Sequence, residues 1–312
     1  MDRQLVGQYT KITSPYPPPG LTLNIRCVSA VAAALGEGPL WDPVRGVIWW
    51  LDIKSPALHA HHAHSGVNRT QALPYRLTAL GLAEDGGLVA IGDAGLVRLS
   101  VTSELRVSST EVIATITLPP GMRFNDGKVD AVGRFWAGSM EDAEQTARGS
   151  LYRVDGRAGV TSIRSDIGIP NGPCFFADGT MLTTDSARGC ITALTLDPDG
   201  TPRAEHEFAR FTPGQGSPDG MAVDAHDHVW IAFWDGWCLR RLSRTGQIVA
   251  EIALPVQRPT CPVFGGAALD QLFVTSATTG LSAEQLQRQP FAGGLLRLEP
   301  GVFGHGSHRF VG

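Results

Sequence analysis

One short pattern recurs six times along this chain, at nearly constant spacing. Each copy has a glycine near its start, a short apolar stretch, a turn with Asp or Gly, and a second stretch rich in Trp, Val and Ile. The copies begin at Glu37, Gly81, Asn125, Asn171, Asp219 and Gly265, with spacings of 44, 44, 46, 48 and 46 residues. Four short strands in about 40–45 residues is the period of one propeller blade. The repeat therefore predicts an all-β fold, a six-bladed β-propeller.

A ring of blades has to close, because an open stack would leave unpaired edges and bare faces at its ends. We expect residues 26–34 (RCVSAVAAA) to supply the strand that completes the last blade. The Pro-rich residues 1–24 read as a polar N-terminal arm, and residues 25–312 as a single propeller domain. A short helix is expected within 280–290.

Charge and cysteine content narrow the classes of partner. The net charge is −4, from 26 Lys and Arg against 30 Asp and Glu, whereas binding to nucleic acid favours a basic surface. No apolar run reaches the roughly 18–20 residues that span a bilayer. The five cysteines are widely spaced without a CxxC pair, which argues against a disulfide framework. We expect a cytoplasmic protein, monomeric or weakly homo-oligomeric, with no nucleic-acid or membrane partner.

Four of the six copies open on a side chain that carries oxygen, namely Glu37, Asn125, Asn171 and Asp219. Equivalent positions in a propeller lie at equivalent places around its axis, so these side chains would converge at one mouth of the channel. Two carboxylates with amide oxygens suit a hard divalent cation. Asn-Gly and Asp-Gly are also ordinary turn pairs, although Glu37-Gly38-Pro39 is not a favoured turn. The pattern predicts an axial divalent-metal site.

Several segments also resemble a known family, the gluconolactonase/regucalcin (senescence-marker protein) family. They are LGEGPLWD (35–42), RFNDGKVDAVGRFWAGSM (123–140), IPNGPC (169–174), SPDGMAVD (217–224), PTCPVFGG (259–266) and the tail at 278–300. The resemblance covers nearly the whole chain from about residue 30, with the motifs in order and at family spacing. It implies a six-bladed propeller and metal-dependent hydrolysis of sugar lactones.

The resemblance also implies roles for particular residues. Glu37, Asn171 and Asp219 match the ligands of one divalent metal ion, which could be Ca, Zn, Mn, Mg or Fe. Asn125 matches a residue near the metal or the substrate, and Arg123 one that contacts substrate oxygens. An acidic residue after AGSM would reach the sugar, and Asp142 is a better match than Glu141. The other interpretation of residues 141–144 is a solvated loop.

These residues suggest a mechanism for a small-molecule sugar lactone. A divalent cation would polarise the ring carbonyl or lower the pKa of a bound water, and Asp219 would accept the water's proton. The product is the open aldonic acid. The sequence lacks the GxSxG motif of serine hydrolases. Two alternatives remain open at this point: a metal-dependent hydrolase of another ester, lactone or organophosphate, and a non-catalytic metal-binding propeller.

Other conspicuous residues are assigned to the scaffold. The histidines of HAHHAH (59–64) are expected on a solvated outer strand, and Cys174 as a buried, unreactive thiol. Trp234 and Trp237 either pack in the core or line the pocket.

Overall fold

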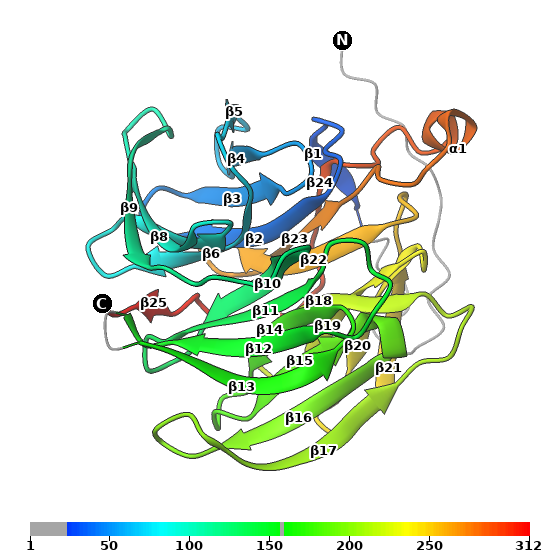
Figure 1. The fold of residues 1–312 in the computed structure, drawn as a ribbon. Coiled ribbons are helices and arrows are strands. Elements are labelled where there is room, and N and C mark those ends of the chain that lie inside the picture. Colours follow the sequence, from blue (N-terminus) through cyan, green and yellow to red (C-terminus); the bar gives the residue numbers. More distant parts are fainter. Residues whose placement is uncertain (1–23, 157–158) are drawn as a thin grey trace.

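Six four-stranded antiparallel units follow one another around a common axis in the computed structural model, which describes residues 24–156 and 159–312 (Figure 1). In blades one to five the four strands follow one another outward from the axis in the order of the sequence, each hydrogen-bonded to the next. The prediction of a six-bladed β-propeller is confirmed. Residues 1–23, nearly all of the predicted arm, lie outside the described residues.

The first three blades follow the chain without interruption. Blade one holds β2 (Gly36–Asp42), β3 (Val47–Asp52), β4 (Ala57–His62) and β5 (Asn68–Ala72). Blade two holds β6 (Leu77–Ala83), β7 (Leu88–Gly92), β8 (Gly95–Val101) and β9 (Val107–Ala114). Blade three holds β10 (Met122–Val129), β11 (Phe135–Glu141), β12 (Gly149–Val154) and β13 (Val160–Ile167).

The last three blades include the point where the ring closes. Blade four holds β14 (Pro170–Phe175), β15 (Met181–Asp185), β16 (Cys190–Leu196) and β17 (Pro202–Arg210), with a 3-10 turn at Ser186–Arg188. Blade five holds β18 (Ser217–Val223), β19 (Val229–Trp234), β20 (Cys238–Leu242) and β21 (Ile248–Ala253). Blade six holds β22 (Pro259–Gly265), β23 (Gln271–Ser276), β24 (Leu295–Leu298) and, from the other end of the chain, β1 (Arg26–Ser29).

Both ends of the described chain are tied into the ring. β1 pairs antiparallel with β24, as closure requires, although the strand covers only the first four of the residues expected to form it. Near the C-terminus, β25 (Arg309–Phe310) adds in parallel to the end of β6. β25 lies at the left of Figure 1, whereas α1 (Ala283–Arg288), the predicted short helix, lies at the right.

The blades are held together by apolar clusters at their junctions. Leu182 and Ile191 of blade four pack with Ile231 and Phe233 of blade five, and similar clusters join the other pairs. Each blade is a sheet that must bury both faces, so stacking around the ring provides a partner for each face.

Three of the blades share a buried hydrogen bond between an aspartate and a tryptophan. The aspartate lies at or just after the end of the inner strand. Its carboxylate accepts a hydrogen bond from the indole of a tryptophan on the second strand. The pairs are Asp42 with Trp49 at 3.2 Å, Asp130 with Trp136 at 2.8 Å and Asp224 with Trp230 at 2.9 Å. These bonds satisfy the indole N–H groups, which burial would otherwise leave unpaired.

Two of the four histidines in the run 59–64 depart from the prediction, whereas His64 is exposed as expected. His59 and His61 are buried, not solvated, because β4 is covered by β5 and its side chains face the neighbouring blades. His59 stacks on Trp50 with ring centroids 4.1 Å apart, and its Nδ1 lies 2.9 Å from Thr70 Oγ1. His61 lies against Phe273 of blade six.

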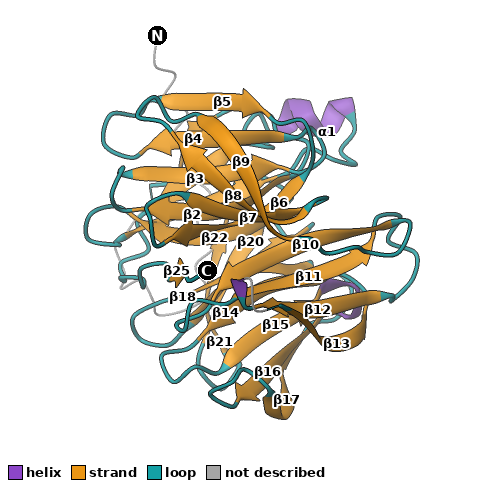
Figure 2. Ribbon diagram, turned by 60° about the vertical axis from the view of Figure 1, so that its left-hand side comes forward, coloured by secondary structure: helices purple, strands orange, loops and turns teal. Residues whose placement is uncertain are grey.

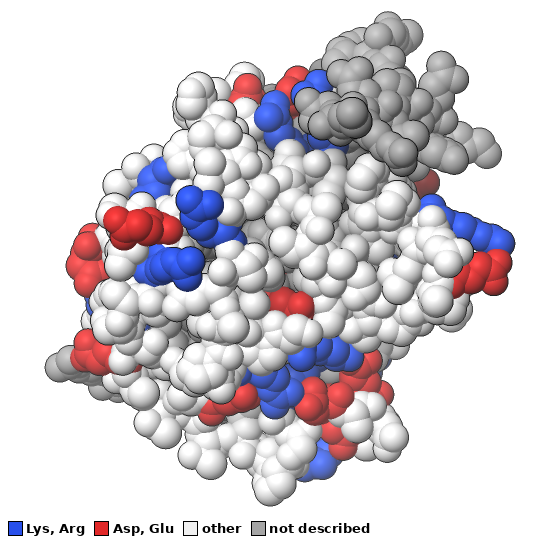
Figure 3. All heavy atoms as spheres, turned by 90° about the horizontal axis from the view of Figure 1, so that it is seen from above, with Lys and Arg blue, Asp and Glu red and all other residues white. Residues whose placement is uncertain are grey.

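The surface carries charges of both signs in small groups. On the face in Figure 3, Lys and Arg side chains lie beside Asp and Glu. Strands dominate the view in Figure 2, and within the described ranges no helix is long and apolar enough to cross a membrane.

Candidate active site

The inner strand of every blade changes register near its beginning. In β2 the shift falls between Glu37 and Leu40, in β14 between Asn171 and Cys174, and in β18 between Pro218 and Met221. Irregularities of this kind re-aim side chains that a regular strand would point at the neighbouring blades. The predicted oxygen-bearing residues lie at these shifts, at one end of the channel.

The proposed common register was wrong for blades two and six. Gly81 pairs with Val89, well past the shift of β6, and Gly265 is the last residue of β22. The residues within the shifts of these two blades include Thr78 and Thr260, both buried. The copies differ by a few residues in the lengths of their loops, so alignment on glycine alone misplaced these two.

Two glycines show why the pattern Glu-Gly-Pro and Asn-Gly-Pro recurs. Gly38 and Gly172, which follow Glu37 and Asn171, have φ values of +56° and +52°. A Cβ at Gly172 would also lie about 3.0 Å from Met221. Glycine is therefore required in each turn, and the same turn presents Glu37 and Asn171 in equivalent ways.

Glu37 and Asp219 form a pair of buried carboxyl groups, each 5% exposed. Burial, reinforced by the nearby charges of Asp219 and Asp126, raises the pKa of Glu37 well above its usual range. Burial, together with the charge of Asp126, likewise raises the pKa of Asp219. Asp219 Oδ1 is buried and has no hydrogen-bond partner among the described residues.

Asp126 is the residue that sequence reasoning missed. Its Oδ2 accepts a hydrogen bond of 2.7 Å from the backbone N–H of Gly172, and its Oδ1 accepts one from Gly127. The carboxylate thus ties blade three to the turn that follows Asn171. The sequence does contain a pattern that indicates Asp126, because Asp126-Gly127 repeats the Asp219-Gly220 dipeptide. Alignment of the third copy on Asn125 instead of Asp126 hides this match.

The side-chain amides of Asn171 and Asn125 form a hydrogen-bonded chain that leads to a buried arginine. Asn125 Nδ2 donates to Asn171 Oδ1 at 2.7 Å, and Arg123 Nη1 donates to Asn125 Oδ1 at 2.6 Å. Asn171 Nδ2 donates to Ser186 Oγ at 2.9 Å. Both amides are oriented by these bonds, and Asn171 Oδ1 keeps one lone pair free of hydrogen bonds from the described residues.

Arg123 is only 3% exposed. Its Nε donates to Asp142 Oδ1 at 2.8 Å, while Nη1 is shared between Asn125 and the carbonyl of Phe124. Asp142 Oδ2 also accepts a bond of 2.8 Å from Arg76. Among the described residues, Arg123 Nη2 makes no closer polar contact than an ion pair with Glu144 Oε1 at 4.0 Å.

Asp142 and Glu141, the two candidate acidic residues after AGSM, have different partners. Asp142 belongs to the Arg123 cluster and is 45% exposed. Glu141 instead accepts hydrogen bonds from the backbone N–H groups of Gln145 and Thr146, so it stabilises its own loop. Of the two, Asp142 is the one that the structure brings to the site.

A cavity of about 370 Å³ lies between the loops of blades four and five, and Ser186, Ser217 and Trp234 are among its lining residues. Ser186 is the link between this cavity and the site, because its Oγ accepts a hydrogen bond from Asn171 Nδ2 at 2.9 Å and donates to the backbone carbonyl of Pro218 at 2.6 Å. The carboxyl groups of Glu37 and Asp219 do not line it. The volume falls within the range of small-molecule sites.

Comparison with known proteins shows the family to which this chain belongs. The family described as "SMP-30/Gluconolactonase/LRE-like region" matches residues 35–278. The chain belongs to this family. Among relatives, it is 33% identical over 291 residues to 6-deoxy-6-sulfogluconolactonase of Pseudomonas putida, covering 93% of this chain and 99% of that one. It is 32% identical to a pentonolactonase of Haloferax volcanii, over 82% and 86% of the two chains.

A solved structure of this family shares the architecture. It is that of a calcium-binding protein, regucalcin, from Agrobacterium tumefaciens, with a TM-score of 0.86 and 31% identity. The match covers 93% of this chain and 98% of that one. The resemblance stated from the sequence is confirmed. The expectation of an enzyme of the lactonase type is also confirmed at the level of the family, because the curated relatives include proteins named lactonases.

The residues at this candidate site fit a divalent cation. The buried carboxylates of Glu37 and Asp219 are hard oxygen donors, and Asp219 Oδ1 has no hydrogen-bond partner among the described residues. Asn171 Oδ1 adds a neutral oxygen donor. Within the described part of the chain, no three His, Cys, Asp or Glu side chains are grouped to hold a metal ion. A centre here therefore depends on the amide oxygen of Asn171.

Proposed function

We propose that this protein hydrolyses a sugar lactone to the aldonic acid, with a divalent cation held by Glu37, Asn171 and Asp219. The observation that carries the proposal is the unpartnered, buried oxygen of Asp219 beside a second buried carboxyl group. Burying two like charges costs free energy unless a cation compensates them. The lactonases among the relatives support the substrate class.

A divalent cation bound there would polarise the ring carbonyl and lower the pKa of water. Asp219 would accept the proton from the attacking water, since one of its oxygens is free of other hydrogen bonds. Asn125, fixed between Arg123 and Asn171, would hold the substrate in register with that water.

The sugar hydroxyls would meet the polar rim of the site. The exposed carboxylate of Asp142 would form part of this rim, and Arg123, which is paired with Asp142 and lies 4.0 Å from Glu144, would support it from blade three. Trp234 borders the adjoining cavity from blade five. A polyol lactone offers hydroxyl groups to such a rim on one side and an apolar ring face on the other.

The test is an indicator assay of proton release on metal-stripped protein, with a panel of five- and six-membered aldonolactones. Each divalent cation is added back in turn, and spontaneous ring opening is subtracted. We expect turnover to return with one or more cations in the wild type and not in Asp219→Ala. Cation binding without turnover on any sugar would overturn the proposal in favour of another ester substrate or a non-catalytic metal-binding propeller.

A further inference from the structure

A second and larger cavity lies at the opposite end of the central channel. Its volume is about 940 Å³. The inner strands contribute their later residues to its wall, among them Leu40 of β2, Lys128 of β10 and Val223 of β18. The proposed cation ligands lie at the beginnings of the same strands. The cavity opens at the opposite end of the channel, and its inner end reaches Gly38 and Asp126, close to those ligands.

The C-terminal tail crosses this mouth as a strap, defined here as residues 305–308. On one side the strap is fastened by Gly304, whose N–H donates to the carbonyl of Leu269 and which forms a bridge with Asp224. On the other side, β25 pairs with β6, and Val311 donates to the carbonyl of Gly133. The strap lines the cavity with its own side chains.

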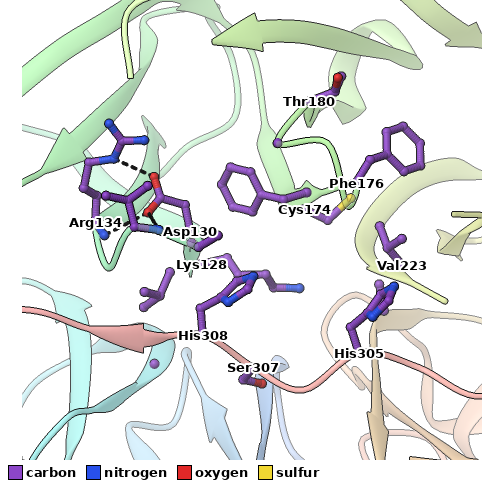
Figure 4. Close-up of a pocket in the computed structure, with 18 of the residues that line it drawn as sticks. Lys128, Asp130, Arg134, Cys174, Phe176, Thr180, Val223, His305, Ser307 and His308 are labelled. Carbon is purple, nitrogen blue, oxygen red and sulfur yellow. Dashed lines mark hydrogen bonds and ion pairs between the residues drawn. The ribbon is translucent and has the colours of Figure 1, made fainter. Parts of the chain in front are cut away.

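Within the described part of the chain, Lys128 and Arg203 are the cations of this cavity without a close ion pair, and Arg203 lies 4.0 Å from Asp197. Lys128 is the more buried of the two. Its Nζ donates to the carbonyl of Met221 at 2.9 Å, and no ion pair to it occurs among the described residues. Arg134, which also lines the cavity, is instead neutralised by Asp130 at 2.7 Å. Figure 4 shows Lys128, His305 and His308 projecting into the same space, with the Arg134–Asp130 pair to one side.

Four carboxylates of the described residues line the cavity. Asp130, Asp178 and Asp197 form ion pairs with arginines, and the fourth, Asp126, lies at the inner end. Both of its oxygens accept backbone N–H bonds, from Gly127 and Gly172, which lie toward the cation end. Those bonds hold Asp126 in place and leave the Lys128 ammonium without a direct partner of opposite charge.

The wall around Lys128 is largely apolar. Phe176, Val223, Val263 and Phe264 contribute to it, and the Cys174 thiol lies among them. Burial raises the pKa of Cys174 to about 12, so this thiol stays neutral, as the sequence analysis expected. Small-molecule sites typically combine such apolar walls with a few convergent polar groups, in volumes of roughly 300–1,000 Å³.

We propose that this cavity is a binding site for a small organic anion. Its acidic group pairs with Lys128 and accepts hydrogen bonds from the strap imidazoles, and its apolar body lies against Phe176, Val223 and Val263. The site is distinct from the lactone site and does not depend on the proposed function.

The test uses 8-anilinonaphthalene-1-sulfonate, a fluorescent anion with an apolar body, titrated into the full-length protein in the presence of EDTA. We expect one saturable site in the wild type, displaced by benzoate. Lys128→Met should weaken binding about tenfold or more, because the charged partner is lost, and Lys128→Arg should restore part of it. Lys54→Met is the matched control, because Lys54 is exposed and remote from the cavity.

A second set of variants guards against a folding defect at Lys128. His305→Ala and His308→Ala alter the strap, outside the blades, and should weaken binding a few-fold with the thermal unfolding midpoint unchanged. Equal affinity in the wild type and Lys128→Met, or the absence of a saturable site in the wild type, would overturn the proposal. If the wild type with added cation has no lactonase activity but still binds the dye at one saturable site, only the proposed function is contradicted.

Discussion

The two ends of the channel are built on the same inner strands and have opposite chemistry. At one end, bulged turns bury Glu37 and Asp219 with Asn171 in a set of oxygen donors. At the other, Lys128 and two strap imidazoles stand in a wide cavity with apolar walls. The repeat supplies equivalent backbone positions at both ends, and the side chains within the bulges and on the tail decide what each end binds.

The largest effect should come from the oxygen-rich end. Asp219→Asn keeps the size of the side chain but removes its charge and its ability to accept a proton from water. We expect kcat/KM on the best aldonolactone to fall by roughly 10²–10⁴-fold, the usual contribution of a general base. Steady-state kinetics with the preferred cation measures it, and Asp199→Asn, on an exposed turn, is the control. Activity within twofold of the wild type would remove Asp219 from the mechanism.

The next prediction tests whether Asp126 positions the proposed cation ligands at the oxygen-rich end. Asp126→Asn leaves one oxygen to accept a bond where two backbone N–H groups now donate, so the turn after Asn171 loosens. It also removes a negative charge close to Glu37 and Asp219. Residues that support ligands in this way typically affect metal affinity by about 10–100-fold. Calorimetric titration of the cation measures the change, and unchanged affinity would contradict the positioning role.

A smaller effect concerns stability without the cation. The pKa of Glu37 is raised by burial and by Asp219, so its ionised form is disfavoured in the fold, and stability should decline as pH rises through that pKa. Glu37→Gln removes this cost. In EDTA we expect the variant to unfold a few degrees above the wild type, with most of the stabilisation by added cation lost. Scanning calorimetry with and without cation measures both, and a metal-free variant less stable than the wild type would contradict the account.

The sequence predicted the fold and one end of the channel for the same reason. Repeats that bury the same faces keep the same spacing, so the period identified the blades, and the opening residues pointed to Glu37, Asn125, Asn171 and Asp219. The selection of Glu37, Asn171 and Asp219 as ligands came from the family resemblance and stays a prediction. Asp126 was missed because two adjacent oxygen-bearing residues, Asn125 and Asp126, share one turn, and only the hydrogen bonds distinguish them.

The other end could not be predicted, because it depends on a segment outside the repeat. The strap at 305–308 has no periodic pattern, and its position follows from the bridges that β25 and Gly304 make with distant blades. The burial of His59 and His61 was missed for a related reason. An apolar environment on both faces of β4 comes from a neighbouring blade, which the local sequence does not show.

His59 lies at neither end of the channel, and its burial predicts how the stability of the fold depends on pH. Burial lowers its pKa to about 4, and its Nε2 has no partner among the described residues, so the folded protein keeps it neutral. The unfolded chain takes up a proton near pH 6.5, so this histidine should make the fold less stable as pH falls from about 6.5 to about 4. His59→Phe preserves the stacking on Trp50 and should flatten the decline of the unfolding midpoint across this window, whereas His226→Phe, at an exposed turn, should not. Cation affinity and dye binding should stay unchanged in His59→Phe, because the residue contacts neither site. If the unfolding midpoint of His59→Phe falls as steeply with decreasing pH as that of the wild type, other groups cause the acid sensitivity. Glu37 and Asp219 are not among them, because their pKa values are raised in the fold and their protonation therefore stabilises it.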